Sequence, residues 1–397
     1  MVVFDNASPI IGVDPGNGLG KVAEWVPFHG SKGEWYVYHD LNIIVDITER
    51  DYENMIERLK GSPLADGFVK VKAKGDWHFY AIGEAALHGK FVGDWRNQRV
   101  QKRAKYRRGY VGLMIIYLLY RNYKRSHREM PESLNVVTAH PPMMASPKFR
   151  EDFTKAVAGN WNLFIGGNKV KTRIERVKII DEVTGAGRNV TLTDDGMPRY
   201  EEHQDSVLNR DSVIFDFGDG TIDVAHMDTN GVVTPLDSSE LGFFRYVQAF
   251  ADEFDSLHGH YFGDNAQTGI PLGLVYKIFL HPQKILENTE WGGPTVDCKE
   301  IFDSTINPFL SQAYTLANTM TGGNLLTAAP QIGIAGGAGS LLYDTLRETI
   351  FLPYVEDGRD DVFLCGSQDR RDMGIYFIAM GLFKDGQAQR REDENGN

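Results

Sequence analysis

The sequence predicts a mixed α/β protein with two lobes of similar topology. Its 397 residues exceed the usual size of a single hydrophobic core, so two lobes are expected. The stretch DPGNGLGKVA, residues 14–23, returns in altered form as DFGDGTIDVA at residues 216–225. Each copy follows an apolar run that is typical of a strand. We therefore expect a strand, a glycine turn and a second strand near the start of each lobe.

The rest of the first half alternates between strand and helix patterns. Strands are expected at residues 34–47, 69–83, 133–140 and 170–183, where β-branched and aromatic residues recur. Helices are expected at residues 51–61, about 96–123 and 146–161, the last with Pro147 in its first turn.

The second half contains mainly helical patterns. These patterns cover residues 241–254, 304–320 and 372–383, while residues 330–342 indicate a strand, a glycine loop and the start of a helix. Residues 185–211 are polar and rich in turn formers, which indicates an irregular insertion after a helix start. Residues 384–397 contain no core-forming side chains, so we expect disorder there, with residues 391–397 as a disordered tail.

The composition is that of an ordinary globular protein, with 42% hydrophobic and 24% charged residues. The formal net charge of -12 argues against a general nucleic-acid binder, although it is compatible with a local basic patch. Two cysteines indicate a fold without structural disulfides, suited to a reducing compartment. The most apolar segment, YVGLMIIYLLY, is shorter than the ~20 residues that span a bilayer. Since the start also lacks a signal-peptide pattern, we expect a cytoplasmic protein without a membrane segment.

A turn of the form D-x-G-x-G can hold a phosphate together with its metal ion. Glycine allows positive φ and close approach, so consecutive backbone N–H groups can point at an anion. An aspartate at the end of the incoming strand repels phosphate but can hold Mg²⁺ or its water shell. A single turn of this kind is typical of ordinary hairpins. Two matched copies behind two strands instead favour a clamp around a nucleotide and Mg²⁺.

The two turns supply most of the candidate ligand-binding residues. Asp14 and Asp216 are the candidates for holding Mg²⁺ through its waters. Lys21 can reach a β- or γ-phosphate, and a solvated strand lysine is the alternative for this residue. Thr221 can donate a hydrogen bond to a phosphate oxygen. The remaining cradle residues are Gly16, Asn17, Gly18, Gly218, Asp219 and Gly220.

A third glycine cluster, GIAGGAGS at residues 333–340, follows a strand pattern. It does not complete G-x-G-x-x-G, and no acidic residue stands about 20 positions later at a second strand end, as a dinucleotide-binding site requires. Its small residues Gly336, Gly337 and Gly339 would let a flat base and ribose lie against the backbone.

These three motifs, in this order, resemble those of the actin superfamily of ATPases. DPGNGLGK is similar to the first phosphate motif, DFGDGTID to the second and GIAGGAGSLL to the adenosine motif. VKIIDEVTGAG resembles the connecting segment of ParM-type segregation proteins, which places Glu182 at the position that orients the attacking water. DMGIYFIAMGLF resembles the second connecting helix. The resemblance implies a two-lobed actin-like fold, a duplicated ribonuclease H-like architecture with the nucleotide cleft between its lobes.

The resemblance further implies an ATP hydrolase that uses Mg²⁺ and assembles into filaments, like the bacterial, plasmid and phage actin-like proteins of the ParM type. Glu182, Asp14 and Asp216 would be its catalytic residues, with a surface glutamate after a strand as the alternative for Glu182. GTP in place of ATP stays open. An adaptor protein would be the partner and DNA an indirect cargo, which fits plasmid partition or DNA segregation.

The expected domain I comprises residues 1–180 and 370–390, and the expected domain II comprises residues 181–369. Arginines recur at helical spacing from Arg96 to Arg107. This stretch is either a solvated helix face or a contact for the next subunit, an adaptor or DNA. Two other functions stay open. One is a non-polymerising phosphotransferase or regulatory ATPase of the same superfamily, and the other is a nucleotide-binding structural protein without turnover.

Overall fold

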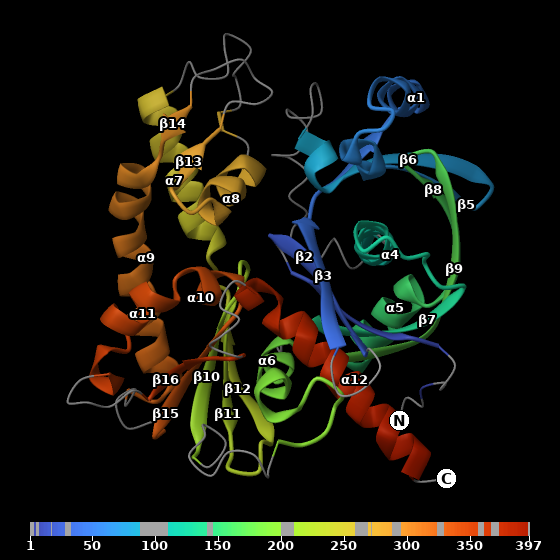
Figure 1. The fold of residues 1–397 in the computed structure, drawn as a ribbon. Coiled ribbons are helices and arrows are strands. Elements are labelled where there is room, and N and C mark those ends of the chain that lie inside the picture. The colour runs from blue at the N-terminus through green and yellow to red at the C-terminus, as the bar shows by residue number, and fades with distance from the viewer. Residues whose placement is uncertain are drawn as a thin grey trace.

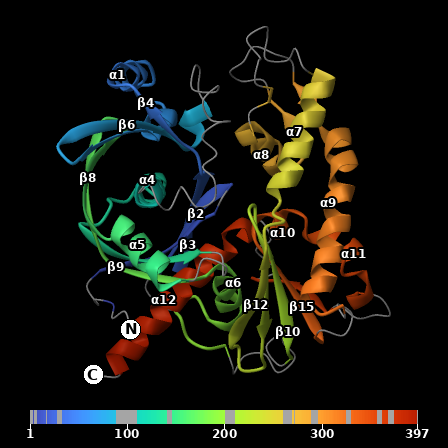
Figure 2. The same ribbon diagram turned by 180° about the vertical axis from the view of Figure 1, so that it is seen from behind.

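The computed structural model has two lobes side by side (Figure 1). It describes residues 4, 8–16, 18–27, 33–87, 110–140, 146–199, 210–258, 269–270, 272–287, 295–323, 329–355, 361–366 and 373–395. Two helices, α6 (Glu182–Thr191) and α12 (Phe377–Asn395), lie where the lobes meet, and the view from behind shows the same arrangement (Figure 2). The prediction of a two-lobed α/β fold is confirmed.

The first lobe is built on a nine-stranded sheet with the order β3-β2-β1-β7-β9-β8-β5-β6-β4 among the described residues. The sheet curls around α4 (Tyr110–Arg125) and α5 (Pro147–Val157), while α1 (Glu49–Arg58) packs on β5 and β6 (Figure 1). Two short 3-10 turns are η1 (Pro63–Gly67) and η2 (Gly83–Leu87). The strands are β1 (Ile10–Pro15), β2 (Leu19–Pro27), β3 (Gly33–Leu41), β4 (Ile44–Ile47), β5 (Phe68–Ala73), β6 (Asp76–Ile82), β7 (Ser133–His140), β8 (Gly159–Ile165) and β9 (Asn168–Asp181).

The sequence explains why two helices lie inside this sheet. In α4 every residue from Val111 to Leu119 is apolar or small and is buried, as expected for a helix that a sheet encloses. α5 starts at Pro147 directly after Ser146, whose hydroxyl accepts a hydrogen bond from the Phe149 N–H at 3.2 Å. The predicted helix with Pro147 in its first turn is therefore confirmed.

The second lobe is built on a five-stranded sheet with the order β12-β11-β10-β15-β16. Its strands are β10 (Ser212–Phe217), β11 (Ile222–Met227), β12 (Val233–Ser239), β15 (Gln331–Ala335) and β16 (Val362–Leu364), and β13 (Ile285–Leu286) pairs separately with β14 (Val296–Asp297). Its helices are α7 (Phe244–His258), α8 (Leu272–Leu280), α9 (Lys299–Met320), α10 (Gly337–Leu341), α11 (Tyr343–Thr349) and the 3-10 turn η7 (Leu352–Tyr354).

Both lobes repeat one local arrangement around the duplicated stretch. β1 pairs antiparallel with β2 and parallel with β7. In the second lobe, β10 pairs antiparallel with β11 and parallel with β15 in the same way. Each strand–turn–strand motif therefore contains an interior strand of its sheet, and the two lobes share the topology that the sequence predicts.

The helices α6 and α12 cross at a contact that only glycine permits. A Cβ atom on Gly381 of α12 would lie 1.8 Å from the carbonyl oxygen of Gly185 in α6. Two residues before this crossing, a Cβ atom on Gly12 of β1 would lie 2.0 Å from the carbonyl oxygen of Ala379 in α12. Close backbone packing therefore holds α12 against the first lobe on one side and against α6 on the other.

The prediction of a disordered tail is wrong for the described residues. α12 extends to Asn395 and is buried as far as Gly386. Buried charged side chains hold it in place. Lys384 donates to the carbonyl oxygen of Asn189 at 3.1 Å, and the Asp385 carboxylate lies 2.6 Å from the Lys178 ammonium. A search for apolar residues misses such a segment because polar contacts anchor it.

Three further sequence expectations can be compared with the structure. The predicted helix at about residues 96–123 is described only as α4, and the arginines from Arg96 to Arg107 lie outside the described residues. Both cysteines, Cys298 and Cys365, are buried and free of disulfides, as predicted. Within the described part of the chain, no helix combines the length and the apolar character needed to cross a membrane.

Candidate functional site

The first glycine turn joins β1 to β2 and carries a buried ion pair. Asp14 faces Lys21 across the two strands. The Lys21 ammonium donates a hydrogen bond to Asp14 Oδ2 at 2.8 Å, and both side chains are buried. The other carboxylate oxygen of Asp14 has no hydrogen-bond partner among the described residues. Lys21 therefore neutralises Asp14 within the first lobe.

The second glycine turn joins β10 to β11 and has a different charge balance. Asp216 stands where Asp14 stands in the first turn, but it faces Asp223 across the strands. Neither carboxylate oxygen of Asp216 has a hydrogen-bond partner in the described chain, and both are buried. Asp223 accepts hydrogen bonds from Thr221 Oγ1, at 2.9 Å, and from Ser238 Oγ. Two facing carboxylates in a buried site require a cation or a proton.

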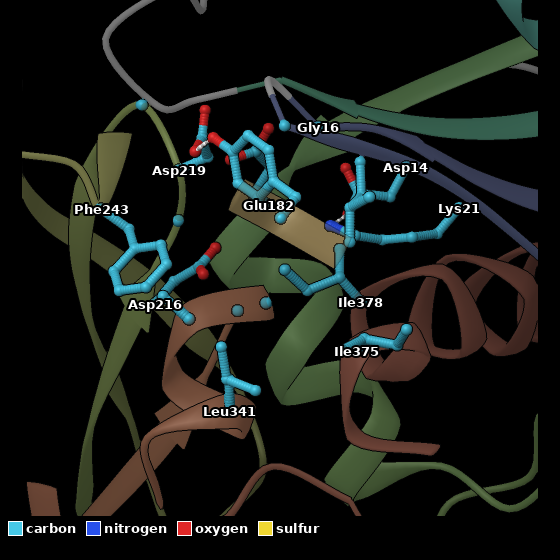
Figure 3. Close-up of a pocket in the computed structure, with 18 of the residues that line it drawn as sticks. Asp14, Gly16, Lys21, Glu182, Asp216, Asp219, Phe243, Leu341, Ile375 and Ile378 are labelled. Atoms are coloured by element: carbon cyan, nitrogen blue, oxygen red, sulfur yellow. Dashed lines mark hydrogen bonds and ion pairs between the residues drawn. The ribbon is translucent and has the colours of Figure 1, made fainter. Parts of the chain in front are cut away.

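Both turns open onto one cavity of about 690 Å³ between the lobes. In Figure 3, Asp14 and Lys21 lie on one side of this cavity, Asp216 lies on the other, and Glu182 lies between them. The predicted site residues that line the cavity are Asp14, Gly16, Gly18, Lys21, Glu182, Asp216, Gly218, Asp219, Gly220, Thr221, Gly336 and Gly337.

Two predicted site residues are not part of this lining. Asn17 lies outside the described residues. A Cβ atom on Gly339 would meet Ile334 Cγ2 at 3.0 Å, so this glycine lets α10 pack closely on the sheet. Gly336 is different: its φ is 84°, and a Cβ atom there would lie 2.2 Å from Asp216 Oδ1. Glycine at this position therefore keeps the space beside Asp216 open.

Three carboxylates meet at the centre of the site. Glu182 is the first residue of α6 and is buried, with 9% of its surface exposed. One ligand oxygen each of Glu182, Asp216 and Asp223 lie within 4.8 Å of one another. Carboxylate oxygens are the ligands that Mg²⁺ prefers, and the two unpartnered oxygens of Asp216 fit such an ion. The donor set therefore suits a magnesium ion with part of its water shell.

Asp223 is the main residue that the sequence prediction missed. It lies seven positions after Asp216, as Lys21 lies seven positions after Asp14. In an antiparallel pair this spacing across the turn puts both residues of each copy opposite one another. Strand pairing around the turn was therefore the signal that could have identified it.

Burial and the neighbouring carboxylates change the protonation behaviour of the site. Burial, followed by the negative charges of Asp223 and Asp14, raises the pKa of Asp216 well above its ordinary value. Burial by itself lowers the pKa of Lys21, but Asp14, Glu182 and Asp216 together outweigh it and leave that pKa raised. The raised pKa of Lys21 favours its charged form, and the raised pKa of Asp216 favours its protonated form.

The sequence prediction also missed an apolar wall of the cavity. The pattern of residues 272–280 was not assigned to any element, yet it forms α8 and supplies part of this wall. In Figure 3, Phe243 lies beside Asp216, and Leu341, Ile375 and Ile378 lie at the end of the cavity away from the two turns. The apolar lining residues are Leu19, Phe243, Tyr276, Phe279, Leu280, Ala338, Leu341, Ile375 and Ile378. Such a wall can hold the flat, weakly polar part of a ligand.

α8 also connects the two lobes across the mouth of the cleft. The Tyr276 hydroxyl donates a hydrogen bond to Asp219 of the second turn. A Cβ atom on Gly18 of the first turn would lie 2.8 Å from the Tyr276 ring. The next residue, Lys277, forms an ion pair with Glu84 of the first lobe. Tyr276 therefore contacts both glycine turns at once.

Sequence comparison matches no protein-family model and no curated protein. Comparison with solved structures gives matches over nearly the whole chain. The crystal structure of the actin-like protein Alp7A has a TM-score of 0.60 and 14% identity, and it covers 98% of this chain and 99% of its own. A ParM subunit from a 15-stranded filament of Clostridium botulinum has a TM-score of 0.64 and 13% identity, with coverage of 96% and 99%.

This chain has the actin-like fold. The archaeal actin homolog Ta0583, in a complex with ADP, is also similar, with a TM-score of 0.59, 12% identity and coverage of 95% and 98%. At these identities the comparisons establish the fold, which confirms the fold class that the motifs implied.

Proposed function

We propose that this actin-like protein binds ATP with Mg²⁺ in the cleft between its lobes, hydrolyses it, and assembles into filaments in a nucleotide-dependent way. One observation carries the proposal: two glycine turns, one from each lobe, line a single cavity that also contains Lys21, Glu182 and Asp216. The Ta0583 structure with ADP supports a nucleotide as the ligand of this fold. GTP stays an alternative to ATP because the apolar wall does not distinguish the two bases.

In this proposal the turns hold the phosphates. Backbone N–H groups of Gly16, Gly18 and Gly220 would point toward the anion, and Asn17 and Asp219 belong to the same two turns. Gly218 would shape the second turn, because its own N–H donates to the Thr221 carbonyl oxygen at 2.9 Å. The Lys21 ammonium, which stays charged, neutralises part of the phosphate charge. Thr221 Oγ1 donates to a phosphate oxygen once it leaves Asp223. Gly336 and Gly337 support the nucleoside, and Gly339 does so indirectly by bringing α10 close to the sheet.

The carboxylates of the site have different tasks. Asp216 and Asp223 would hold Mg²⁺ through its waters, and Asp14 would contribute its free Oδ1 to the same water shell. The bound ion would neutralise charge on the phosphates. Glu182 would accept a hydrogen bond from a water, orient its oxygen toward the γ-phosphorus and take up the proton that this water loses. That oxygen forms the new P–O bond while the bond to the β-phosphate oxygen breaks, which releases ADP and phosphate.

The lobes provide the link to assembly. Contacts to the γ-phosphate made by both turns favour one cleft angle, and their loss after hydrolysis favours another. The similar ParM structure is that of a filament, which supports head-to-tail self-assembly of this chain as well. We place the protein in the cytoplasm, with plasmid or DNA segregation through an adaptor as its role. The proposed domains are residues 1–180 with 370–390 and residues 181–369.

The test is a pelleting assay with ATP, GTP and ADP, in which phosphate release is measured in the same samples. Sedimentable filaments with a triphosphate and Mg²⁺, followed by phosphate release and disassembly, are expected. Hydrolysis that depends on a second substrate and gives no filaments would instead identify a non-polymerising phosphotransferase or regulatory ATPase. Tight nucleotide binding without turnover or filaments would identify a structural nucleotide-binding protein. No binding of any of these nucleotides would contradict the proposal.

A further inference from the structure

The convex side of the first-lobe sheet carries cations and aromatic rings in alternating rows. We define this outer face by the residues Lys70, Lys72, Trp77, Phe164, Lys169, Lys171 and Arg173. Strand register places them on one side of the sheet. Lys169 of β9 is opposite Phe164 of β8, which is opposite Lys70 of β5, and Lys72 is opposite Trp77 of β6. Across the sheet, rows of cations on β9 and β5 thus alternate with rings on β8 and β6.

The rings and the lysines of the outer face contact one another. The Lys70 ammonium lies 4.6 Å from the centre of the Trp77 ring, and the Lys72 ammonium lies 5.9 Å from it. Phe164 packs edge-on against Trp77, with 6.0 Å between ring centres. Trp77 is nevertheless 41% exposed, which makes it one of the large apolar side chains most accessible to solvent in the described chain. An exposed tryptophan ring among cations offers an apolar face, poorly hydrated, on which a flat ligand ring can stack.

The charges of the outer face are not balanced by the protein itself. Within the described residues, no carboxylate pairs with Lys70, Lys72, Lys169 or Lys171, while Arg173 pairs with Glu175 at 3.1 Å. The pattern is unusual for a chain with a net charge of -12. No described helix covers the convex side of β8 or of the first half of β9 in either view (Figure 1, Figure 2). On β5 and β6, α1 packs on this same side, where Tyr52 contacts Phe79, the residue opposite Lys70. The part of the outer face that α1 leaves open is cationic and partly aromatic.

Charge complementarity identifies the partner as an anion, and the residue types narrow the choice. Four of the five cations are lysines, which are depleted from the centres of protein–protein interfaces but are common contacts of phosphate backbones. Interleaved rings give unpaired bases a surface on which to stack. The helix on this side of the sheet, α1, carries four carboxylates, Glu49, Asp51, Glu53 and Glu57, and is therefore unsuited to a groove of duplex DNA. These features favour a single strand over a duplex and over an acidic protein.

We propose that the outer face binds single-stranded nucleic acid, with Lys72, Lys169 and Lys171 on the phosphates and Trp77 stacked on a base. The overall negative charge does not prevent this. At physiological salt, charges beyond about 8 Å are largely screened, so a strand on the sheet responds mainly to the local cations. The inference is independent of the proposed ATPase, because Trp77 and these lysines do not line the cavity between the lobes.

The test measures fluorescence anisotropy of a labelled 20-nucleotide oligothymidylate, and of a duplex of the same length, with the full chain at low and at physiological salt. The unmodified protein should bind the single strand more tightly than the duplex. Trp77→Ala should weaken single-strand binding about tenfold, since stacking contributes roughly 1–3 kcal/mol per base. The double variant Lys72→Ala/Lys171→Ala should reduce the slope of log K against log salt by about 1.4, or 0.7 per lost phosphate contact.

A matched control keeps the result interpretable. Lys148→Ala/Lys155→Ala removes two exposed lysines from α5 in the same lobe and should leave binding unchanged. Binding that is absent at low salt, or that survives both outer-face variants, would overturn the proposal. Equal affinity for duplex and single strand would also overturn it. So would outer-face variants that lose filament mass when the unmodified protein binds no oligonucleotide, because the face would then be an assembly contact. Nucleotide binding by Trp77→Ala, measured in parallel, tests the cavity separately.

Discussion

The two glycine turns share one backbone form but differ in charge at one equivalent position. In the first lobe, the residue opposite the aspartate is Lys21, and the pair is neutral. In the second lobe, the residue opposite Asp216 is Asp223, so this pair consists of two carboxyl groups and contains no cation. In the proposed function, this difference at a single cross-strand position leaves Lys21 available for the phosphates and the carboxylates of the second turn for the metal.

The sharpest test of this division concerns Glu182, which belongs to neither turn but lies between them. Glu182→Gln should bind ATP and Mg²⁺ nearly normally and reduce the rate of hydrolysis about a thousandfold, because an amide cannot accept the proton of the attacking water. Single-turnover phosphate release measures this rate, and equilibrium binding of ATP is the control. A turnover rate equal to that of the unmodified protein would exclude Glu182 from the chemistry.

The second prediction sets the two aspartates against each other. Asp216→Asn should weaken Mg²⁺-dependent ATP binding about 100-fold, because it removes a charge from the only turn whose aspartate lacks a cationic partner. Asp14→Asn should weaken it only about tenfold, because Lys21 stays available for phosphate. Calorimetry with and without Mg²⁺ measures both. Equal losses in the two variants would show that the turns are not specialised.

The third prediction follows from the raised pKa of Asp216. Without nucleotide or metal, the folded protein binds a proton there more tightly than the unfolded chain does. This contribution to stability is fully present below the ordinary aspartate pKa and is lost as the pH rises through the raised folded pKa. Asp216→Asn should therefore increase the free energy of unfolding at neutral pH by about 1–3 kcal/mol.

Urea unfolding between pH 5 and pH 8 measures this effect. Asp14→Asn is the matched control and should have the opposite sign, since it removes the carboxylate that pairs with Lys21. A stabilised Asp14→Asn variant, or an Asp216→Asn variant as sensitive to pH as the unmodified protein, would contradict the assigned charge balance.

The smallest predicted effect concerns the ion pair that joins α8 to the first lobe. Lys277 and Glu84 are 44% and 47% exposed at their side chains, so their ion pair contributes at most about 1 kcal/mol. Glu84→Ala should thus speed nucleotide release by up to about fivefold, as seen with a fluorescent ATP analogue. The exposed pair Lys299–Asp303 within α9 gives the control Lys299→Ala, which should have no effect. If Glu84→Ala releases the nucleotide at the same rate as the unmodified protein, the contact between α8 and the first lobe does not help to keep the lobes closed.

The parts of the site that repeat in the sequence were predictable. Asp14, Lys21 and Asp216 follow apolar strands and stand beside glycines, so local spacing alone indicates their chemistry. Asp223 depends on which residues face each other across a hairpin, and Tyr276 depends on a helix that reaches the site from outside the motifs. Such long-range placement is not contained in local periodicity.

The elements of the fold also differ in this way: local sequence patterns indicate some of them, and others depend on residues far away in the sequence. Elements with clear periodicity were predictable: β7 matches its predicted range, and α5 starts as predicted but ends at Val157, because the last residues of the predicted helix belong to strand β8. The end of α12 does not, because its order comes from charged residues whose partners, Lys178 and Asp194, lie about 200 positions earlier. Polarity indicated a solvated tail, and only the tertiary structure reveals that these charges are paired.

Beyond the crossing at Gly381, the last part of α12 would convert a small change in the angle between the lobes into a larger shift of its end. Close packing on β1 ties α12 to the first lobe, while Arg391 forms an ion pair with Asp195 of the segment after α6 at 2.9 Å. Arg391 lies ten residues beyond the pivot, which is about 15 Å along a helix. A change of about 10° in the angle between the lobes would therefore shift this end by roughly 2.6 Å, enough to separate the pair. On this geometry, the Arg391–Asp195 ion pair would form or break according to how far the cleft is open.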